Sequence, residues 1–259
     1  MKILTKGTKE WAESNVNFSK GCANGCLYCY ARRMGSRFGW KPTEDWINME
    51  NKVWMSEKKF HKRVGRIMSP SSHDITTANV DLGIKVFMNI LSAGNKLLIV
   101  TKPNPAVVEK ICNQLNKWKS QILFRFTIGT LNDEVRAYWE PYASTIQERL
   151  DTTKSLYNNG WATSVSVEPF LDETVIKLVE ELLPYVSDTI WVGPMNKIHV
   201  PKELWTKELS QLYSPTSLKK KYGKLQKLGN SKIRFKDHFI SIMNKDNFIT
   251  KTCVEIKVN

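Results

Sequence analysis

The chain has 259 residues, of which 41% are hydrophobic and 25% charged, as in a globular protein with one large domain or two small ones. No run approaches the ~18 consecutive apolar residues that cross a membrane. The N-terminal stretch MKILTKGTKEW has no apolar core long enough for a signal peptide. We therefore expect a cytoplasmic protein, in a reducing compartment where clustered cysteines bind metal more often than they pair.

The formal net charge of +14 allows two interpretations. Lysine and arginine release counterions when they contact phosphates, so a basic chain suits a polyanionic partner such as nucleic acid. Alternatively, lysine is simply abundant, because the excess is mostly lysine spread along the chain rather than arginine gathered in one element. Composition favours neither interpretation.

Strand and helix patterns alternate along the chain. Runs of β-branched and aromatic residues bounded by turn residues predict six strands, at 15–21, 65–70, 96–102, 122–130, 162–169 and 188–195. Helical periodicity predicts helices in the intervals 79–94, 104–118, 144–160 and 172–186. Asn104 is the expected N-cap before Pro105, and Gly94 and Gly160 are expected to end their helices.

This alternation predicts an α/β fold with a parallel sheet and right-handed crossovers. Six strand–helix units are too few for a closed eight-stranded barrel, so we predict a partial (β/α)6 barrel over residues 1–200. Residues 201–259 are basic, with helical patterns at 201–213 and 214–229. We predict that they form a C-terminal extension that packs on the core.

Polar residues follow the predicted strands at their carboxyl ends, where parallel α/β sheets place their chemistry. They are residues 71–74, Thr101, Lys102, residues 127–130, Glu168, Asn196 and Lys197. We expect these side chains to lie around one mouth of the barrel.

Three of the five cysteines lie close together in the segment GCANGCLYCYARR, which follows the first predicted strand. A closed tetrahedral metal site has four ligands, whereas a [4Fe–4S] cluster held only by Cys22, Cys26 and Cys29 leaves one iron open to another chelator. Gly21 and Gly25 permit the tight loop that such a cluster requires.

The alternative is a zinc ion completed by His61 or His73. Zinc sites usually contain two paired-cysteine knuckles, and the chain has no second C-x2-C, so the cluster is favoured. Cys112 and Cys253 lie outside the loop, and we expect both to be buried thiols.

The C-x3-C-x2-C spacing after the first predicted strand resembles the radical S-adenosylmethionine superfamily, and the stretch CLYCYAR strengthens the match. The resemblance implies that the open iron of a [4Fe–4S] cluster binds S-adenosylmethionine, which one electron cleaves to a 5′-deoxyadenosyl radical. It also implies an electron donor such as flavodoxin or ferredoxin, and it places Tyr28 near the adenine.

A wider set of motifs resembles the spore photoproduct lyase-like group over roughly residues 5–200. The motifs are GTKEWAESNVNFSKGCANGCLYCYAR, PSSHDIT, LLIVTKP, ILFRFTIGT, WEPYASTIQERL, SVEPFLD and WVGPMN. The resemblance implies that Lys102 pairs with the carboxylate of S-adenosylmethionine and Ser72 with its amino group. Thr127 and Asn196 are further candidates for cofactor binding. His73 and Asp74 are candidates for substrate contact, with a structural histidine and a helix cap as the alternatives.

One departure from the group concerns the stretch SPSSHD, which has no cysteine where spore photoproduct lyases carry a hydrogen-atom donor. This absence disfavours repair of thymine dimers. A smaller branch of related enzymes, the queuine lyases, is compatible with the size and composition. That likeness implies cleavage of the C–N bond of queuine to give 7-aminomethyl-7-deazaguanine for tRNA modification.

A guanine-like base requires a carboxylate facing its ring N–H and exocyclic amine, because buried donors without partners are costly. Glu168 is the best-placed candidate, and Asp74 and Glu140 are alternatives. A base is able to stack on Trp191, Phe126 or Tyr28, although each ring equally suits packing.

Three functions therefore remain after sequence analysis. The first is a radical lyase acting on a small modified base, with queuine as the specific prediction. The second is a repair or modification lyase acting on DNA or RNA, with the basic extension holding phosphates. The third is a non-catalytic metal-binding module that attaches to nucleic acid.

Overall fold

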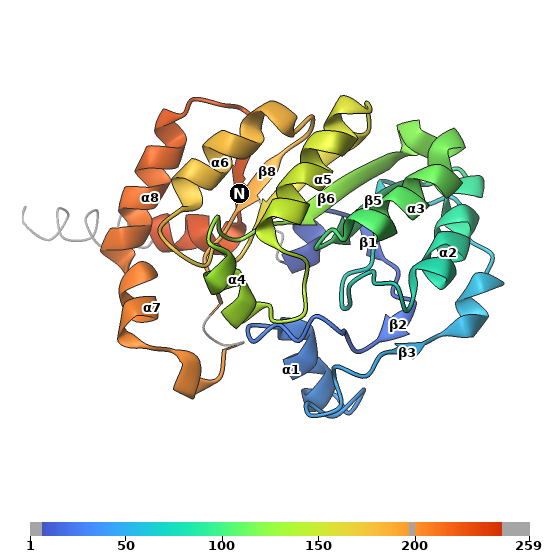
Figure 1. Cartoon of the computed structure of the whole chain (residues 1–259), viewed down its shortest axis with the longest axis horizontal. Coiled ribbons are helices and arrows are strands. Elements are labelled where there is room, and N and C mark those ends of the chain that lie inside the picture. The colour runs from blue at the N-terminus through green and yellow to red at the C-terminus, as the bar shows by residue number, and fades with distance from the viewer. Residues whose placement is uncertain (1–6, 197–199, 245–259) are drawn as a thin grey trace, which may run out of the picture.

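The computed structural model describes residues 7–196 and 200–244, and its main sheet has seven parallel strands. Their order across the sheet is β1 (Ser14–Asn15), β4 (Arg66–Ser69), β5 (Lys96–Thr101), β6 (Ile122–Thr127), β7 (Ala162–Val167), β8 (Ile190–Val192) and β9 (Ile233–Phe235). Every neighbouring pair is parallel. Figure 1 shows the sheet curling within a layer of helices. The predicted partial α/β barrel is confirmed.

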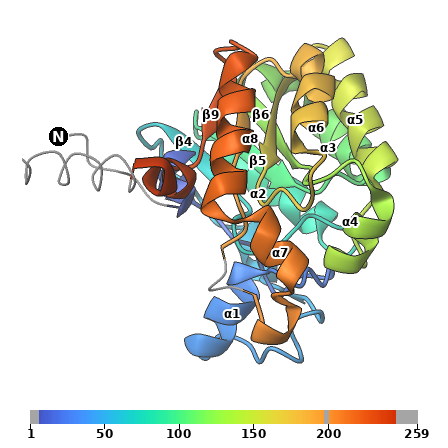
Figure 2. The same ribbon diagram turned by 90° about the vertical axis from the view of Figure 1, so that its left-hand side faces the viewer.

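Helices cover the outer face of this sheet (Figures 1 and 2). The longer ones are α2 (Val80–Ser92), α3 (Pro105–Leu115), α5 (Ile146–Asn158), α6 (Val175–Leu182) and α8 (Pro215–Lys227). Three others, α1 (Tyr30–Arg37), α4 (Asp133–Trp139) and α7 (Lys207–Leu212), lie towards one end of the barrel. Short 3-10 turns occupy Gly7–Glu10, Val53–Ser56, Asn116–Gln121, Leu183–Tyr185 and Lys202–Leu204.

Two strand predictions differ from the structure. The strand predicted at 15–21 is divided, because β1 ends at Asn15 and β2 (Ser19–Lys20) pairs antiparallel with β3 (Glu50–Asn51) in a separate sheet. The C-terminal extension supplies β9, which pairs with β8 and makes a seventh strand that the sequence did not predict. With three residues, β9 is too short to show an alternating pattern. The division of the chain at residue 200 stays a prediction.

The two faces of the sheet carry different side chains. The outer face packs against the helices in the main apolar core, to which Ile67, Ile99 and Phe124 contribute. The inner face holds a small apolar cluster of Ala12, Met68, Leu98 and Leu123. One layer closer to the carboxyl ends, the inner positions are Val100, Arg125 and Ser164. The barrel interior therefore becomes more polar towards the mouth.

Candidate functional site

The cysteine loop, residues 21–29, lies at the carboxyl ends of the strands. It follows β2 and ends where the Cys29 Sγ accepts a hydrogen bond from the Arg32 N–H at 3.4 Å and caps α1. Gly21 has a φ of +80°, and a Cβ there would stand 2.6 Å from the Trp46 carbonyl oxygen. Cys22 N–H donates to that same oxygen at 2.8 Å. The backbone of the loop is therefore fixed by the segment that precedes β3.

Cys26 is buried, Cys22 and Cys29 are half-buried, and the three side chains lie close enough to influence one another. Burial raises the pKa of Cys22 to about 12, and burial raises the pKa of Cys26 still further; nearby cysteines add to both shifts. A metal favours the thiolate form by supplying positive charge, so a buried thiol group of this kind suits a cationic cluster. The residues present therefore fit an iron–sulfur cluster held by three cysteines.

A site for a single metal ion has different requirements from a site for an iron–sulfur cluster. Within residues 7–196 and 200–244, no group of three or more His, Cys, Asp or Glu side chains could hold one metal ion. The thiolates of a cubane each bind a different iron, so they stand around a cluster rather than converge on one point. The described residues thus present no formed tetrahedral zinc site.

His73 is bonded within the protein through both ring nitrogens. Its Nε2 accepts from the Phe18 and Ser19 N–H groups at 3.2 and 3.1 Å, and its Nδ1 lies 3.0 Å from the Asp74 carbonyl oxygen. These contacts require the neutral ring with its proton on Nδ1. Burial lowers the pKa of His73 to about 4. Through these hydrogen bonds, the ring connects residues 18 and 19, which precede the cysteine loop, to the loop after β4.

Acidification is expected to destabilise the wild-type protein more than the variant His73→Gln. The pKa of His73 is about 4 in the folded protein against an ordinary 6.5, so its contribution is fully present above pH 6.5 and is lost as the pH falls towards 4. The free energy of unfolding should fall by about 3 kcal/mol over this range because of this one group. Urea unfolding at several pH values measures the free energy of unfolding of both proteins. Parallel pH profiles for the two proteins would contradict the prediction.

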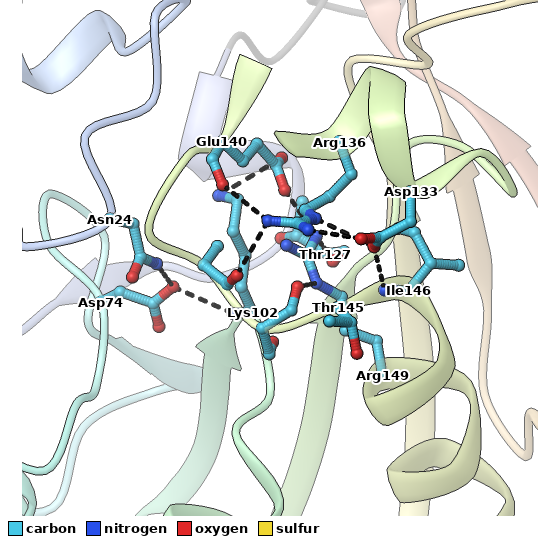
Figure 3. Close-up of polar contacts among 12 residues, drawn as sticks. Asn24, Asp74, Lys102, Thr127, Asp133, Arg136, Glu140, Thr145, Ile146 and Arg149 are labelled. Atoms are coloured by element: carbon cyan, nitrogen blue, oxygen red, sulfur yellow. Dashed lines mark hydrogen bonds and ion pairs between the residues drawn. The ribbon is translucent and has the colours of Figure 1, made fainter. Parts of the chain in front are cut away.

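Asp74 joins the loop after β4 to the cysteine loop and to β5 (Figure 3). Its Oδ2 accepts from the Asn24 Nδ2 at 2.6 Å and from the Lys102 N–H at 3.0 Å. Its Oδ1 accepts from the Ile75 N–H at 2.7 Å and from the Thr101 hydroxyl. Both carboxylate oxygens are thus engaged by the protein.

Glu140 is a completely buried carboxylate at the end of α4, next to the cysteine loop. The Arg149 Nη1 lies 2.6 Å from one of its oxygens, and the Lys102 Nζ lies 3.9 Å from the other (Figure 3). The Tyr28 hydroxyl donates to that second oxygen. Burial by itself would raise the pKa of Glu140, but Arg149 and Lys102 hold it below its ordinary value. The carboxylate therefore stays ionised and fixes a tyrosine and a lysine beside Cys26.

Glu168 stands apart from this network, on the inner side of the barrel after β7. Its side chain is 29% exposed, and its Oε2 lies 3.6 Å from the Lys236 Nζ. Gly193 allows this approach, because a Cβ there would stand 2.8 Å from the Lys236 Cγ and 3.2 Å from the Glu168 Cγ. Burial raises the pKa of Glu168 to about 6, and Lys236 opposes that rise.

Buried polar atoms without partners lie deeper in the barrel than Glu168. Arg125 has its guanidinium carbon 4.8 Å from the Trp11 ring centre and 5.8 Å from that of Trp191. Its Nη1 and the Ser166 Oγ are buried and have no hydrogen-bond partner among the residues that the structure describes. Such atoms are rare in native proteins, and they suit the polar edge of a ligand.

The other predicted site residues have these positions. Ser72 is half-buried, and its N–H donates to the Asn17 Oδ1 at 3.1 Å. The Thr127 carbonyl oxygen accepts from the Arg149 Nη1 at 3.2 Å. Asn196 is exposed. The predicted Lys197 and Cys253 lie outside the described residues. Cys112 is half-buried on α3, and Phe126 is buried in the outer core, whereas Trp191 is on the inner face.

Sequence reasoning missed Arg149, Asn24 and Lys236. Arg149 is one of several polar residues on α5, Asn24 is a spacer between two cysteines, and Lys236 is one of many lysines. No local pattern distinguishes them, because their partners come from other elements.

Two known proteins resemble the chain in sequence. No family model matches the chain. An uncharacterized protein of Acidianus two-tailed virus is 25% identical over 181 residues, covering 64% of this chain and 58% of its own length. An uncharacterized protein of Methanocaldococcus jannaschii is 26% identical over 163 residues, covering 62% of this chain and 61% of its own. The chain thus spans less than two thirds of the length of either relative.

Solved structures share the fold. Streptococcus suis SuiB bound to S-adenosylmethionine superposes with a TM-score of 0.57 at 13% identity, over 86% of this chain and 49% of SuiB. SuiB bound to its precursor peptide SuiA superposes with a TM-score of 0.56 at 11% identity, over 90% of this chain and 51% of SuiB. The likeness shows that the chain shares the partial-barrel fold of SuiB. Among the described residues, no helix has the length and apolarity needed to cross a membrane.

Proposed function

We propose that the chain is a radical S-adenosylmethionine enzyme that acts on a modified nucleobase. The observation that carries this proposal is the loop of three clustered cysteines, one buried and two half-buried, at the carboxyl ends of a partial barrel. In this proposal Cys22, Cys26 and Cys29 hold a [4Fe–4S] cluster in a cytoplasmic protein, with flavodoxin or ferredoxin as electron donor. When bound, the cluster and S-adenosylmethionine would supply a 5′-deoxyadenosyl radical that takes a hydrogen atom from the substrate.

The residues proposed to bind the cofactor follow the carboxyl ends of the strands or belong to the cysteine loop. Lys102 is the proposed partner of the S-adenosylmethionine carboxylate, because Glu140 orients its ammonium beside Cys26 and Tyr28. Burial alone would lower the pKa of Lys102, but Cys26, Tyr28 and Glu140 raise it well above the ordinary value, so the charge is kept. Tyr28, Ser72, Thr127 and Asn196 complete the proposed set.

Among the four residues proposed for substrate binding, Glu168 suits the role best. The polar atoms of His73, Asp74 and Glu140 are engaged within the protein, so we assign these three to holding the site in shape. Glu168 is partly exposed and has one cation beside it, which leaves capacity to accept from a guanine-like ring. In its finer form, the proposal is a queuine lyase that releases 7-aminomethyl-7-deazaguanine.

Anaerobic reconstitution with iron and sulfide, followed by S-adenosylmethionine and dithionite, tests the reaction class. We expect release of 5′-deoxyadenosine, measured by chromatography. No release from protein that carries its cluster would contradict the proposal and favour the non-catalytic metal-binding module.

The same experiment with queuine present tests the substrate. The wild-type protein should form 7-aminomethyl-7-deazaguanine, while Glu168→Gln should lose this product at least tenfold and keep 5′-deoxyadenosine release without substrate, because one charged hydrogen-bond acceptor is worth more than tenfold. Glu173→Gln, an exposed carboxylate paired with Lys221, is the matched control and should behave as wild type. Release of 5′-deoxyadenosine without the base product would retain the reaction class and reject queuine.

The second candidate function is a lyase or modification enzyme acting on DNA or RNA. A basic groove beside α1, lined by Arg32, Arg33 and Arg37, favours it.

A further inference from the structure

The helix that follows the cysteine loop carries an unusual share of the arginines. Three of the chain's nine arginines, Arg32, Arg33 and Arg37, lie in the eight residues of α1. The basic excess is mostly dispersed lysine, as the sequence indicates, but one third of the arginines lie in this single helix. Arginine presents a planar set of donors that matches phosphate oxygens and is the common choice for nucleic-acid contacts.

These arginines line a groove of about 530 Å³ beside α1. Met34, Ser36, Thr43 and Pro201 complete its walls. The Arg33 Nη1 donates to the Val200 carbonyl oxygen at 3.2 Å, which fixes one wall against the other. Arg32 is half-buried, and within residues 7–196 and 200–244 its buried Nε has no hydrogen-bond partner. The nearby Asp45 is paired with Lys41 at 2.5 Å, and Glu50 shares the same ammonium.

Two large aromatic rings extend this surface past the end of α1. Phe38 and Trp40 are 54% and 50% exposed, and their rings stack with centroids 5.6 Å apart and planes 25° apart. The Arg37 guanidinium carbon lies 5.5 Å from the Phe38 ring centre. The Trp40 N–H donates to the Gly35 carbonyl oxygen at 2.8 Å, which anchors the pair to the helix. Exposed aromatics beside arginines are what single-stranded nucleic acids need, since their bases stack while their phosphates are neutralised.

The groove lies close to the proposed reaction centre. Cys29 caps α1, and Arg37 follows it by about 12 Å along the helix axis, from the rise of 1.5 Å per residue. Tyr30 at the start of α1 donates to the Ser71 carbonyl oxygen, in the loop that precedes Ser72. Arg32 lines the groove and stands three residues after Cys29, so the groove begins within one helical turn of the cysteine loop.

We propose that the arginine groove of α1, with the Phe38–Trp40 stack, binds single-stranded nucleic acid. The inference extends the proposed function by placing the nucleobase in a polynucleotide, and the binding itself needs no radical reaction. Its failure is thus distinguishable from failure of the reaction, because binding is measured without S-adenosylmethionine.

Fluorescence anisotropy of labelled single-stranded RNA and DNA, titrated with reconstituted protein at several salt concentrations, tests the inference. Arg33→Gln with Arg37→Gln should weaken binding about tenfold and reduce the slope of log affinity against log salt by about 0.7 for each lost phosphate contact. Phe38→Ala with Trp40→Ala should weaken binding roughly tenfold and leave that slope unchanged, because stacking is not ionic.

The matched control is Lys220→Gln with Lys224→Gln, which removes the same charge from exposed positions on α8. It should keep near wild-type affinity. If the arginine and lysine double variants lost the same amount of affinity, net charge alone would attract the nucleic acid, and the inference would be overturned. Duplex DNA bound as tightly as single strands would overturn it too. If an acidic peptide bound more tightly than single-stranded nucleic acid, and the arginine double variant lost that binding, the partner would be a peptide rather than a nucleic acid.

Discussion

Replacement of Cys26 by alanine is expected to abolish the brown absorbance of the reconstituted protein. Cys26 is buried in the cysteine loop, and the charges of Cys22 and Cys29 both affect its pKa, so it belongs to the same group of thiols. Without it, two thiolates would remain for a cluster that needs three from this chain. Bound iron should fall from about four atoms per chain to near zero, measured by absorbance and iron analysis.

The matched control for this variant is Cys112→Ala, which removes a half-buried thiol from α3. It should keep the full iron content and absorbance. Retention of the cluster in Cys26→Ala would mean that the ligands are wrongly chosen. A single zinc ion bound by wild-type protein prepared without oxygen would contradict the cluster itself.

Local patterns account for much of what the sequence predicted. The β5 strand was predicted at 96–102 and spans Lys96–Thr101, because its apolar run is bounded on both sides. The N-cap of α3 is Asn104, which accepts from the Val107 N–H as expected. The capping box of α5 begins at Thr145, because the glutamate of the box, Glu148, stands three positions after the cap. The short helix α4 was missed, because seven residues give too few turns for periodicity.

The candidate site likewise has a part that local sequence predicts and a part that it does not. The three cysteines are close in sequence, so their spacing alone predicts a common ligand. The partners of Glu140 and Glu168 are not predictable from spacing, because Arg149 comes from the next helix and Lys236 from the C-terminal extension. Sequence reasoning therefore offered three carboxylates for one role. Only their partners in the fold separate Asp74 and Glu140, which are bonded internally, from Glu168.

Replacement of Glu140 by glutamine is expected to lower the free energy of unfolding by about 3–5 kcal/mol. The side chains of Glu140 and Arg149 are both completely buried, and Lys102 lies 3.9 Å from the same carboxylate. Removing the one negative charge would leave a buried guanidinium without its counter-ion and a nearby ammonium less compensated. Urea unfolding at pH 7 measures the loss.

Two comparisons show whether burial of the charge, rather than loss of any carboxylate, causes this effect. Glu181→Gln removes the partner of Lys154 from a half-exposed ion pair 3.3 Å long, and should cost less than about 1 kcal/mol. Adding Arg149→Met to Glu140→Gln should restore part of the stability, because the uncompensated guanidinium is then gone. If Glu140→Gln cost no more than Glu181→Gln, the carboxylate would not be holding Lys102 and Tyr28 beside Cys26. The arrangement of the cofactor-facing residues would then need another cause.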